Sequence, residues 1–170
     1  MEQKKYSLRP LQTKDAARMT QMMKDEQTTR YLQIGGKDYT EETALRFISG
    51  TGDESENLHR AVVDENDIYQ GSISLKHIDR ETGEAEYAVS MHPDAQGKGA
   101  ASVATAGILE IAFRQLELKR VYLNVLDENE RANRFYQKFG FQYTHSDTMD
   151  FHGVEKKLNW YEQLAAEMCE

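Results

Sequence analysis

The sequence is short of cysteine and of long apolar runs. Its single cysteine among 170 residues, Cys169, has no partner for a disulfide within the chain. No apolar stretch approaches the roughly 20 residues that a bilayer-spanning helix requires. The opening MEQKKYSLRP also lacks the apolar core of a secretory signal. The sequence therefore predicts a soluble, cytoplasmic protein with no membrane partner.

Basic residues are also fewer than acidic residues. The chain has 21 Lys and Arg against 29 Asp and Glu, which gives a net charge of -8. A general nucleic-acid-binding protein needs a basic face that neutralises phosphates, so we expect no nucleic-acid partner. The acidic balance is compatible with a cationic small molecule or a basic peptide, although acidity for solubility alone produces the same composition.

The distribution of apolar residues predicts one domain over residues 1–170. No repeat or Pro/Gly/Ser-rich linker divides it, and the only prolines are Pro10 and Pro93. Helical spacing follows a first short strand at 6–11, and the pattern then changes to short β-rich segments joined by polar turns. The expected order is β-α-α-β-β-β-α-β-α-β-β, a mixed α/β domain whose first half is antiparallel.

The helix ends have their own signals. Thr13 and Thr40 are candidate N-caps of the first two helices, and Gly50 and Gly140 are candidate stops. The expected helices span about 13–32, 40–50, 100–116 and 128–139, and a turn is expected at Gly153. The buried faces predicted from helical spacing are Ala16, Met19, Met22 and Met23; Ala44, Leu45, Phe47 and Ile48; and Ala132, Phe135, Tyr136 and Phe139.

Two glycines stand at the start of the third helix, in the stretch HPDAQGKGAASVATAGILEIAF. The first N–H groups of a helix have no partner within it, and the helix dipole adds partial positive charge. Gly97 and Gly99 let an anion approach these groups without meeting a Cβ atom, and Lys98 adds a positive charge. The pattern predicts a phosphate site; the plain alternative is a flexible turn that starts a helix well.

Two other phosphate motifs fit this turn less well. A P-loop requires Lys and then Ser or Thr after its last glycine, whereas Gly99 is followed by Ala100. The dinucleotide fingerprint G-x-G-x-x-G fits at Gly97 and Gly99 but has Ser102 in the third place, with Asp127 as its candidate ribose ligand. A nucleotide-dependent oxidoreductase domain stays open as an alternative, and it predicts repeated parallel β-α-β units.

The turn QGKGAA has the form Q-x-x-G-x-A, and a second motif follows in NVLDENERANRFYQKFGF. Together and in this order they resemble the acyl-CoA signature and the following strand–helix motif of the GNAT superfamily of N-acyltransferases. The stretch AEYAVSMHPDAQGKG resembles the branch that includes ribosomal-protein, polyamine and amino-sugar acetyltransferases. The expected element order also matches that family along nearly the whole chain. The residues that match the second motif are Asn129, Tyr136, Lys138, Gly140 and Phe141.

The resemblance implies acetyl-CoA as cosubstrate and a single acyl-CoA N-acyltransferase domain. Its sheet is expected to be mixed and mostly antiparallel, splayed between its fourth and fifth strands (84–91 and 121–126) and flanked by helices. Acetyl-CoA is then expected in this opening, with its pantetheine arm pairing along the earlier strand as an added strand does. The cofactor-binding residues implied are Val89, Met91, Gln96, Gly97, Lys98, Gly99, Ala100, Ala101, Asn124 and Asn129.

The same resemblance implies that Tyr136 is the general acid that protonates the departing thiolate. By periodicity alone Tyr136 is a core aromatic, and both roles hold if its hydroxyl points into the opening. Glu86 is the candidate general base for an amine whose pKa is about 10.4. A surface glutamate on an alternating strand is an equal alternative for Glu86, and Glu84 is a lesser candidate. Asn124 stands where relatives that acetylate protein N-termini often have a glutamate, and an amide cannot act as a base.

The predicted reaction is transfer of an acetyl group from acetyl-CoA to a primary amine of a small molecule or a peptide, by direct attack in a ternary complex. A non-catalytic acyl-CoA-binding module is the other alternative on this fold; it would keep the glycine turn and lose the acid. The β-rich end of the chain is compatible with pairing in a homodimer. No metal is expected, because the residues that gather near that end match no ligand motif: His145, Asp147, Asp150 and His152.

Overall fold

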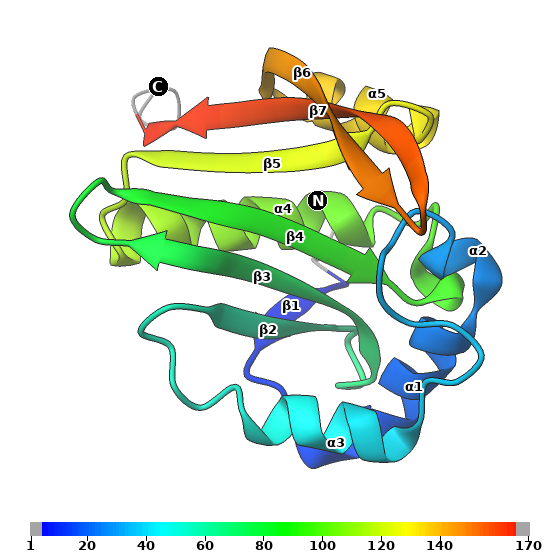
Figure 1. Ribbon diagram of the computed structural model, residues 1–170. Coiled ribbons are helices and arrows are strands. Elements are labelled where there is room, and N and C mark those ends of the chain that lie inside the picture. Colours follow the sequence, from blue (N-terminus) through cyan, green and yellow to red (C-terminus); the bar gives the residue numbers. More distant parts are fainter. Residues whose placement is uncertain (1–4, 166–170) are drawn as a thin grey trace.

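The computed structural model describes residues 5–165, so Cys169 lies outside the described residues. A seven-stranded sheet runs through the protein in the order β1-β2-β3-β4-β5-β7-β6 (Figure 1). Its strands are β1 (Ser7–Arg9), β2 (Leu58–Val63), β3 (Tyr69–Asp79), β4 (Glu84–Met91), β5 (Arg120–Leu126), β6 (Gln142–Phe151) and β7 (Val154–Leu164).

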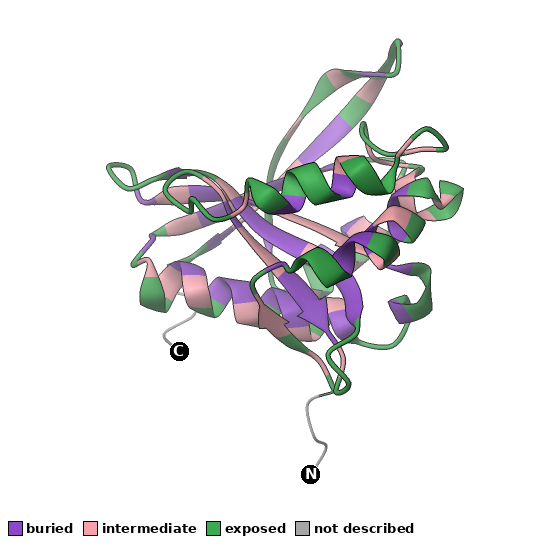
Figure 2. Cartoon of the chain, turned by 90° about the horizontal axis from the view of Figure 1, so that it is seen from below, coloured by how far each residue is buried: buried purple, intermediate pink, exposed green. Residues whose placement is uncertain are grey.

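Helices cover both faces of this sheet. Val62 packs in a core with α4 and α5, whereas its neighbours Ala61 and Val63 pack in a second core with α1 and α3. Because successive strand residues point to opposite faces, the two pairs of helices lie on opposite sides. Figure 2 shows buried residues along the strands and the inward sides of the helices. The α-helices are α1 (Ala16–Lys24), α2 (Glu26–Thr29), α3 (Glu41–Ser49), α4 (Ala100–Glu110) and α5 (Glu130–Phe139).

Strand direction separates two of the functional alternatives. Within residues 5–165, every neighbouring pair of strands is antiparallel except β4 and β5. A dinucleotide-binding domain would need repeated parallel β-α-β units. That alternative is therefore wrong, and the predicted mixed, mostly antiparallel sheet is confirmed.

Several predictions of local structure are confirmed. The hydroxyl of Thr40 accepts a hydrogen bond from the Thr43 N–H at 3.2 Å and caps α3. Gly50 and Gly140 follow the last residues of α3 and α5, and Gly153 lies in the turn between β6 and β7. The methionine-rich face predicted for the first helix is buried. Side-chain chemistry thus sets these ends and faces locally.

Other helix predictions are wrong in detail. Thr13 does not cap α1; it lies in a short 3-10 turn (Thr13–Asp15) for which Gln12 is the N-cap. The expected single helix over 13–32 breaks at Asp25, whose carboxylate accepts the Thr28 N–H at 2.8 Å and starts α2. The third helix changes after α4 into a π-helical turn, Ile111–Gln115. Leu45 and Phe47 of α3 are each 40% exposed instead of buried.

A close strand approach at Gly71 gives a test of this fold. A Cβ atom on Gly71 would lie 2.5 Å from the Ser90 carbonyl oxygen and 3.0 Å from the Met91 Cα, both backbone atoms of β4. We expect Gly71→Ala to lower the free energy of unfolding by about 1–3 kcal/mol, measured by urea denaturation. The matched control is Gly52→Ala, where a Cβ meets nothing within 4 Å; we expect a change within about 0.5 kcal/mol. Equal effects of the two variants would contradict the packing of β3 on β4.

Candidate functional site

The parallel pairing of β4 with β5 is incomplete. Glu84, Ala85 and Glu86 pair with Arg120, Val121 and Tyr122, and the register ends there. The remaining residues, 87–91 of β4 and 123–126 of β5, still pair with β3 and β7 on their outer sides. We call these two unpaired stretches the β4–β5 gap, and Figure 1 shows the strands diverging along it. The predicted splay between the fourth and fifth strands is confirmed. Val89 and Met91 lie in the β4 part of the gap, and Asn124 lies in the β5 part.

The glycine turn is separated from β4 by a short 3-10 turn, Pro93–Ala95. Gly99 has φ 85° and is the N-cap of α4, which begins at Ala100. Among residues 5–165, no acceptor takes a hydrogen bond from the N–H groups of residues 97–101. A Cβ atom at Gly99 would meet nothing within 4 Å, so the backbone is open on that side. Helix N-termini of this kind attract anions.

Side chains hold this turn against its surroundings. Gln96 donates from its amide nitrogen to the Met91 carbonyl oxygen and to the Thr28 hydroxyl, each at 3.2 Å. The Gln96 N–H itself donates to the Pro93 carbonyl oxygen at 3.3 Å. The free N–H groups therefore begin at Gly97, one residue later than the sequence suggested. Lys98 is exposed, and the Arg131 guanidinium of α5 lies 3.8 Å from where a Cβ on Gly97 would stand.

His92 fixes the start of the turn. Its Nδ1 accepts the Asp94 N–H at 3.1 Å, and its Nε2 lies 3.1 Å from Gln21 Oε1. Burial, reinforced by the Arg18 charge, lowers the pKa of His92 below its ordinary value. A neutral imidazole matches this pattern, because one nitrogen accepts while the other donates.

Tyr136 approaches from the α5 side of the sheet. Its ring is 8% exposed and packs edge-on against Tyr87 of β4, with 5.7 Å between ring centroids. Its predicted place in the core is confirmed. Burial raises the pKa of Tyr136 to about 12, with the Tyr87 hydroxyl acting slightly against the shift. The phenol therefore holds its proton at neutral pH and is chemically able to give it to a stronger base.

Glu86 lies on the other face of β4. Its neighbour Tyr87 points toward α4 and α5, since the Tyr87 hydroxyl is 2.7 Å from the Thr105 hydroxyl of α4, so Glu86 points away from those helices. Its side chain is 19% exposed, and one carboxylate oxygen is 3.9 Å from Lys76 Nζ. Tyr136 and Glu86 thus flank β4 from opposite faces of the sheet: Glu86 belongs to the last pair with β5, and Tyr136 packs on Tyr87, the next residue.

Aromatic rings extend this second face across β5, β7 and β6. Tyr122 of β5 lies 6.3 Å from Trp160 of β7, measured between ring centroids. His145 of β6 stacks on Trp160 with 4° between the ring planes, and the Trp160 indole N–H donates to Asp147 at 3.0 Å. We call Tyr122, Trp160 and His145 the aromatic strip. Asn124 is opposite Trp160 in the β5–β7 register.

The segment after α2 covers one end of this face. Tyr31 packs with Trp160 against a small buried cluster of Leu126, Phe151 and Leu158. His152 Nε2 lies 3.2 Å from the Leu32 carbonyl oxygen. Of the residues that the sequence singled out near the end of the chain, His145 and Asp147 therefore both contact Trp160, whereas His152 lies beside Leu32. Across the part of the chain that the structure describes, no three His, Cys, Asp or Glu side chains gather in a metal-binding group.

The start of α5 has two asparagines with different partners. Asn129 is the N-cap, and its side-chain oxygen accepts the Ala132 N–H at 3.3 Å. Asn133, which sequence reasoning missed, is buried and bonded to backbone and side chains around it. The one signal for it in the sequence is a polar residue one turn before Tyr136, on the same side of the helix.

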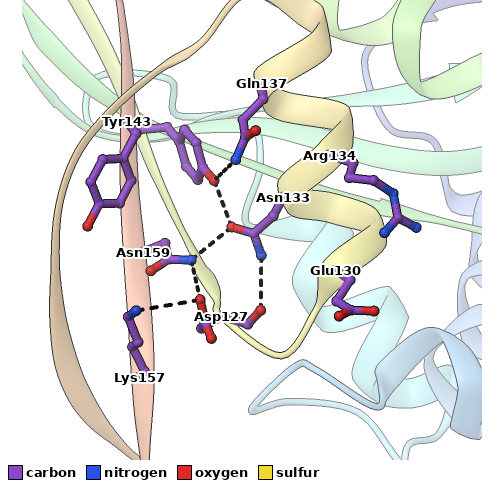
Figure 3. A pocket seen from close by; sticks show the side chains of 9 residues that line it. Asp127, Glu130, Asn133, Arg134, Gln137, Tyr143, Lys157 and Asn159 are labelled. Carbon is purple, nitrogen blue, oxygen red and sulfur yellow. Dashed lines mark hydrogen bonds and ion pairs between the residues drawn. The ribbon is translucent and has the colours of Figure 1, made fainter.

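An open polar cleft lies beside these residues, between α5 and the β6–β7 hairpin (Figure 3). It has a volume of about 470 Å³, and its buried polar residues are Asn133, Asn159 and Tyr161. It is separate from the glycine turn and from Glu86. Its lining residues are Asp127, Glu130, Asn133, Arg134, Gln137, Tyr143, Lys157, Asn159 and Tyr161.

Comparison with known sequences identifies a matching family. The family described as "Acetyltransferase (GNAT) domain" matches residues 6–142. Spermidine N(1)-acetyltransferase of Escherichia coli K12 is 31% identical over 134 residues, which cover 79% of this chain and 71% of that protein. The uncharacterized N-acetyltransferase p20 of Bacillus licheniformis is 27% identical over 143 residues, covering 81% and 79% of the two chains.

Solved structures share the fold. Spermidine N-acetyltransferase of Vibrio cholerae, in complex with CoA and spermine, superposes with a TM-score of 0.88 at 20% identity. The match covers 99% of this chain and 100% of that one. A GNAT-family acetyltransferase of Bacillus anthracis gives a TM-score of 0.84 at 20% identity, covering 97% and 98% of the two chains.

Within residues 5–165, no helix is both long enough and apolar enough to cross a bilayer.

Proposed function

Because this chain belongs to the GNAT acetyltransferase family and is an N-acetyltransferase that uses acetyl-CoA, we propose that its reaction takes place at the β4–β5 gap. The observation that carries this proposal is the end of β4–β5 pairing after three residue pairs. Beyond those pairs, the facing backbone N–H and C=O groups of the two central strands do not bond to each other. An extended pantetheine arm supplies hydrogen-bonding groups of the kind that an added strand supplies, along Val89 and Met91.

The diphosphate of acetyl-CoA binds the glycine turn. Five successive N–H groups, from residues 97–101, have no acceptor among the described residues. Lys98 and Arg131 add positive charge near them. Gln96 acts through its side chain, which ties the turn to the end of β4. Asn129 contributes by capping α5 beside the turn, and Asn124 lies in the β5 part of the gap.

The acid and the base act from opposite faces of the sheet. Glu86, directly or through a water, takes a proton from the ammonium group, whose reference pKa is about 10.4, and the free amine attacks the thioester carbon. The C–S bond then breaks, and Tyr136 gives its proton to the departing thiolate. The new amide nitrogen loses its extra proton, which returns through water to the Tyr136 phenolate. The phenol is protonated at neutral pH, as a proton donor must be; burial raises its pKa, so close contact with the departing sulfur has to favour the transfer.

The acceptor is a linear polyamine. The Escherichia coli relative is a spermidine N(1)-acetyltransferase. This chain has two carboxylates beside its aromatic strip: Glu86 is opposite Tyr122 in the β4–β5 register, and Asp147 accepts the Trp160 indole N–H. Ammonium groups bind aromatic faces through cation–π attraction, worth about 0.5–2 kcal/mol each. One ammonium group lies at Glu86 for reaction, and another lies over Trp160. Cytoplasmic location and homodimer assembly stay predictions from the sequence.

The proposed binding of the diphosphate at the glycine turn is tested at Gly99. We expect Gly99→Asp to raise the dissociation constant of CoA at least about tenfold, because the carboxylate occupies the open side of the turn and repels the diphosphate. The control is Gly153→Asp. Gly153 has the same φ of 85° and equally open surroundings, but it lies in the β6–β7 turn. Calorimetric titration with CoA measures both variants. Equal affinities for CoA in the two variants would remove the diphosphate from this turn.

The proton donor is tested at Tyr136. We expect Tyr136→Phe to lower kcat about 100-fold and to change the KM for acetyl-CoA by less than about threefold, because the ring packing remains and only the hydroxyl is lost. Tyr143→Phe, at a 55% exposed tyrosine of β6, is the control and keeps its activity. An unchanged kcat in the Tyr136→Phe variant would exclude Tyr136 as the acid.

The acceptor class is tested with a panel of amines. Thiol release from acetyl-CoA is followed with spermidine, propylamine, glucosamine and a peptide with a free N-terminus, and we expect the highest kcat/KM for spermidine. Trp160→Leu lowers kcat/KM for spermidine about tenfold and for propylamine less than twofold, and Trp160→Phe restores most of the loss. A higher kcat/KM for the peptide or the sugar, or equal losses for both amines, would contradict a polyamine on the aromatic strip.

A further inference from the structure

We propose that Asn133 is a positioning residue for Tyr136. This inference rests on the proposed role of Tyr136 as proton donor. Its basis is the hydrogen-bond network of Asn133, which joins α5 to the end of β5 and to the middle of β7. Figure 3 shows its bonds to Asp127 and Asn159.

Every hydrogen-bonding site of the Asn133 side chain is in use. Its nitrogen donates to the carbonyl oxygens of Leu126, at 3.0 Å, and Asn129, at 2.8 Å. Its oxygen accepts from the Tyr161 hydroxyl at 2.8 Å and from Asn159 Nδ2 at 3.0 Å. A side-chain amide has two donor hydrogens and two acceptor lone pairs, so this set is complete. Such a set fixes both the position and the rotation of the group that holds it.

The place of these bonds explains why they matter. Leu126 is the last residue of β5, in the gap, where β5 pairs with β7 but not with β4. Asn133 adds a second tether there, from the helix that follows. An apolar residue at a buried helix position packs without needing any partner, whereas a buried amide costs stability unless it is fully bonded. The choice of asparagine therefore favours a requirement for placement over a requirement for packing.

Tyr136 lies one helical turn beyond Asn133 and shares its surroundings. Its ring centroid is 6.2 Å from that of Tyr161, the residue whose hydroxyl donates to Asn133. The same hydroxyl accepts from Gln137 Nε2 at 3.0 Å. Two α5 side chains, on either side of Tyr136 in sequence, thus bind one fixed point of β7. Rotation of α5 about its axis, which would move the Tyr136 ring away from Tyr87, breaks these bonds.

The test is a double-mutant cycle in kcat. Asn133→Leu keeps the number and branching of side-chain heavy atoms and removes all of these bonds. We expect kcat to fall about tenfold with the KM for acetyl-CoA unchanged within about threefold, because a misplaced proton donor slows the chemical step. In the Tyr136→Phe background, the same change lowers kcat less than twofold. A residue that acts only through Tyr136 has nothing left to position there.

The controls distinguish failure of the positioning role of Asn133 from failure of Tyr136 as the acid. Gln163→Leu removes a different buried amide, in β7, whose carbonyl oxygen has no partner among the described residues. We expect this variant to keep kcat within twofold in both backgrounds. A tenfold loss from Asn133→Leu in both backgrounds, or none in either, would overturn the positioning role. If Tyr136→Phe alone leaves kcat unchanged, the proposed acid fails instead. Should Asn133→Leu not fold, Tyr161→Phe keeps the ring and removes the two bonds of its hydroxyl, to Asn133 and from Gln137. We then expect a loss of about threefold in kcat when Tyr136 is present and none in the Tyr136→Phe background.

Discussion

Hydrogen bonding between β4 and β5 ends after three residue pairs, in the middle of the sheet. Central strands normally satisfy their backbone groups on both sides, so this interruption needs support from other elements. Aromatic packing supplies part of it: the rings of Tyr87, Tyr136 and Phe141 meet pairwise at 5.7 Å between centroids. Asn133 supplies another part by holding the free end of β5. The glycine turn, the proposed acid and the proposed base are all arranged around this one interruption.

The two faces of the sheet have different chemical characters near the gap. On the α5 side the surroundings are apolar and buried, and they keep the Tyr136 phenol neutral. On the other side stand Glu86, a polar amide at Asn124 and the aromatic strip. Transfer of an acetyl group to an amine needs proton removal at the nucleophile and proton donation at the leaving group. In our proposal, opposite faces of the sheet keep these two tasks apart, and the acidic charge of the chain is compatible with a cationic acceptor.

Features set by local chemistry were predictable from the sequence. Gly50, Gly140 and Gly153 mark ends and turns because glycine terminates helices and accepts left-handed backbone, and Thr40 caps α3 as its hydroxyl allows. The order of elements and the splay of the sheet followed from two motifs and the family that they resemble. Two local features were missed, because each has a competing local alternative: Asp25 caps a separate helix, and the Gln96 N–H bonds to Pro93. The exposure of Leu45 and Phe47 was not predictable, because it depends on which elements pack against α3.

Asn133 shows the limit most clearly, because its four partners come from β5, α5 and β7 and no local pattern brings them together. The roles of Tyr136, Glu86 and the glycine turn belong to the proposal, and the location of the cofactor underlies all of them. A crystal structure with acetyl-CoA bound tests that location most directly. The account predicts diphosphate oxygens about 3 Å from the N–H groups of residues 97–101, with the pantetheine arm alongside residues 87–91 of β4. A diphosphate bound elsewhere, or β4 and β5 paired through to Met91 and Leu126 with the cofactor outside, would contradict it.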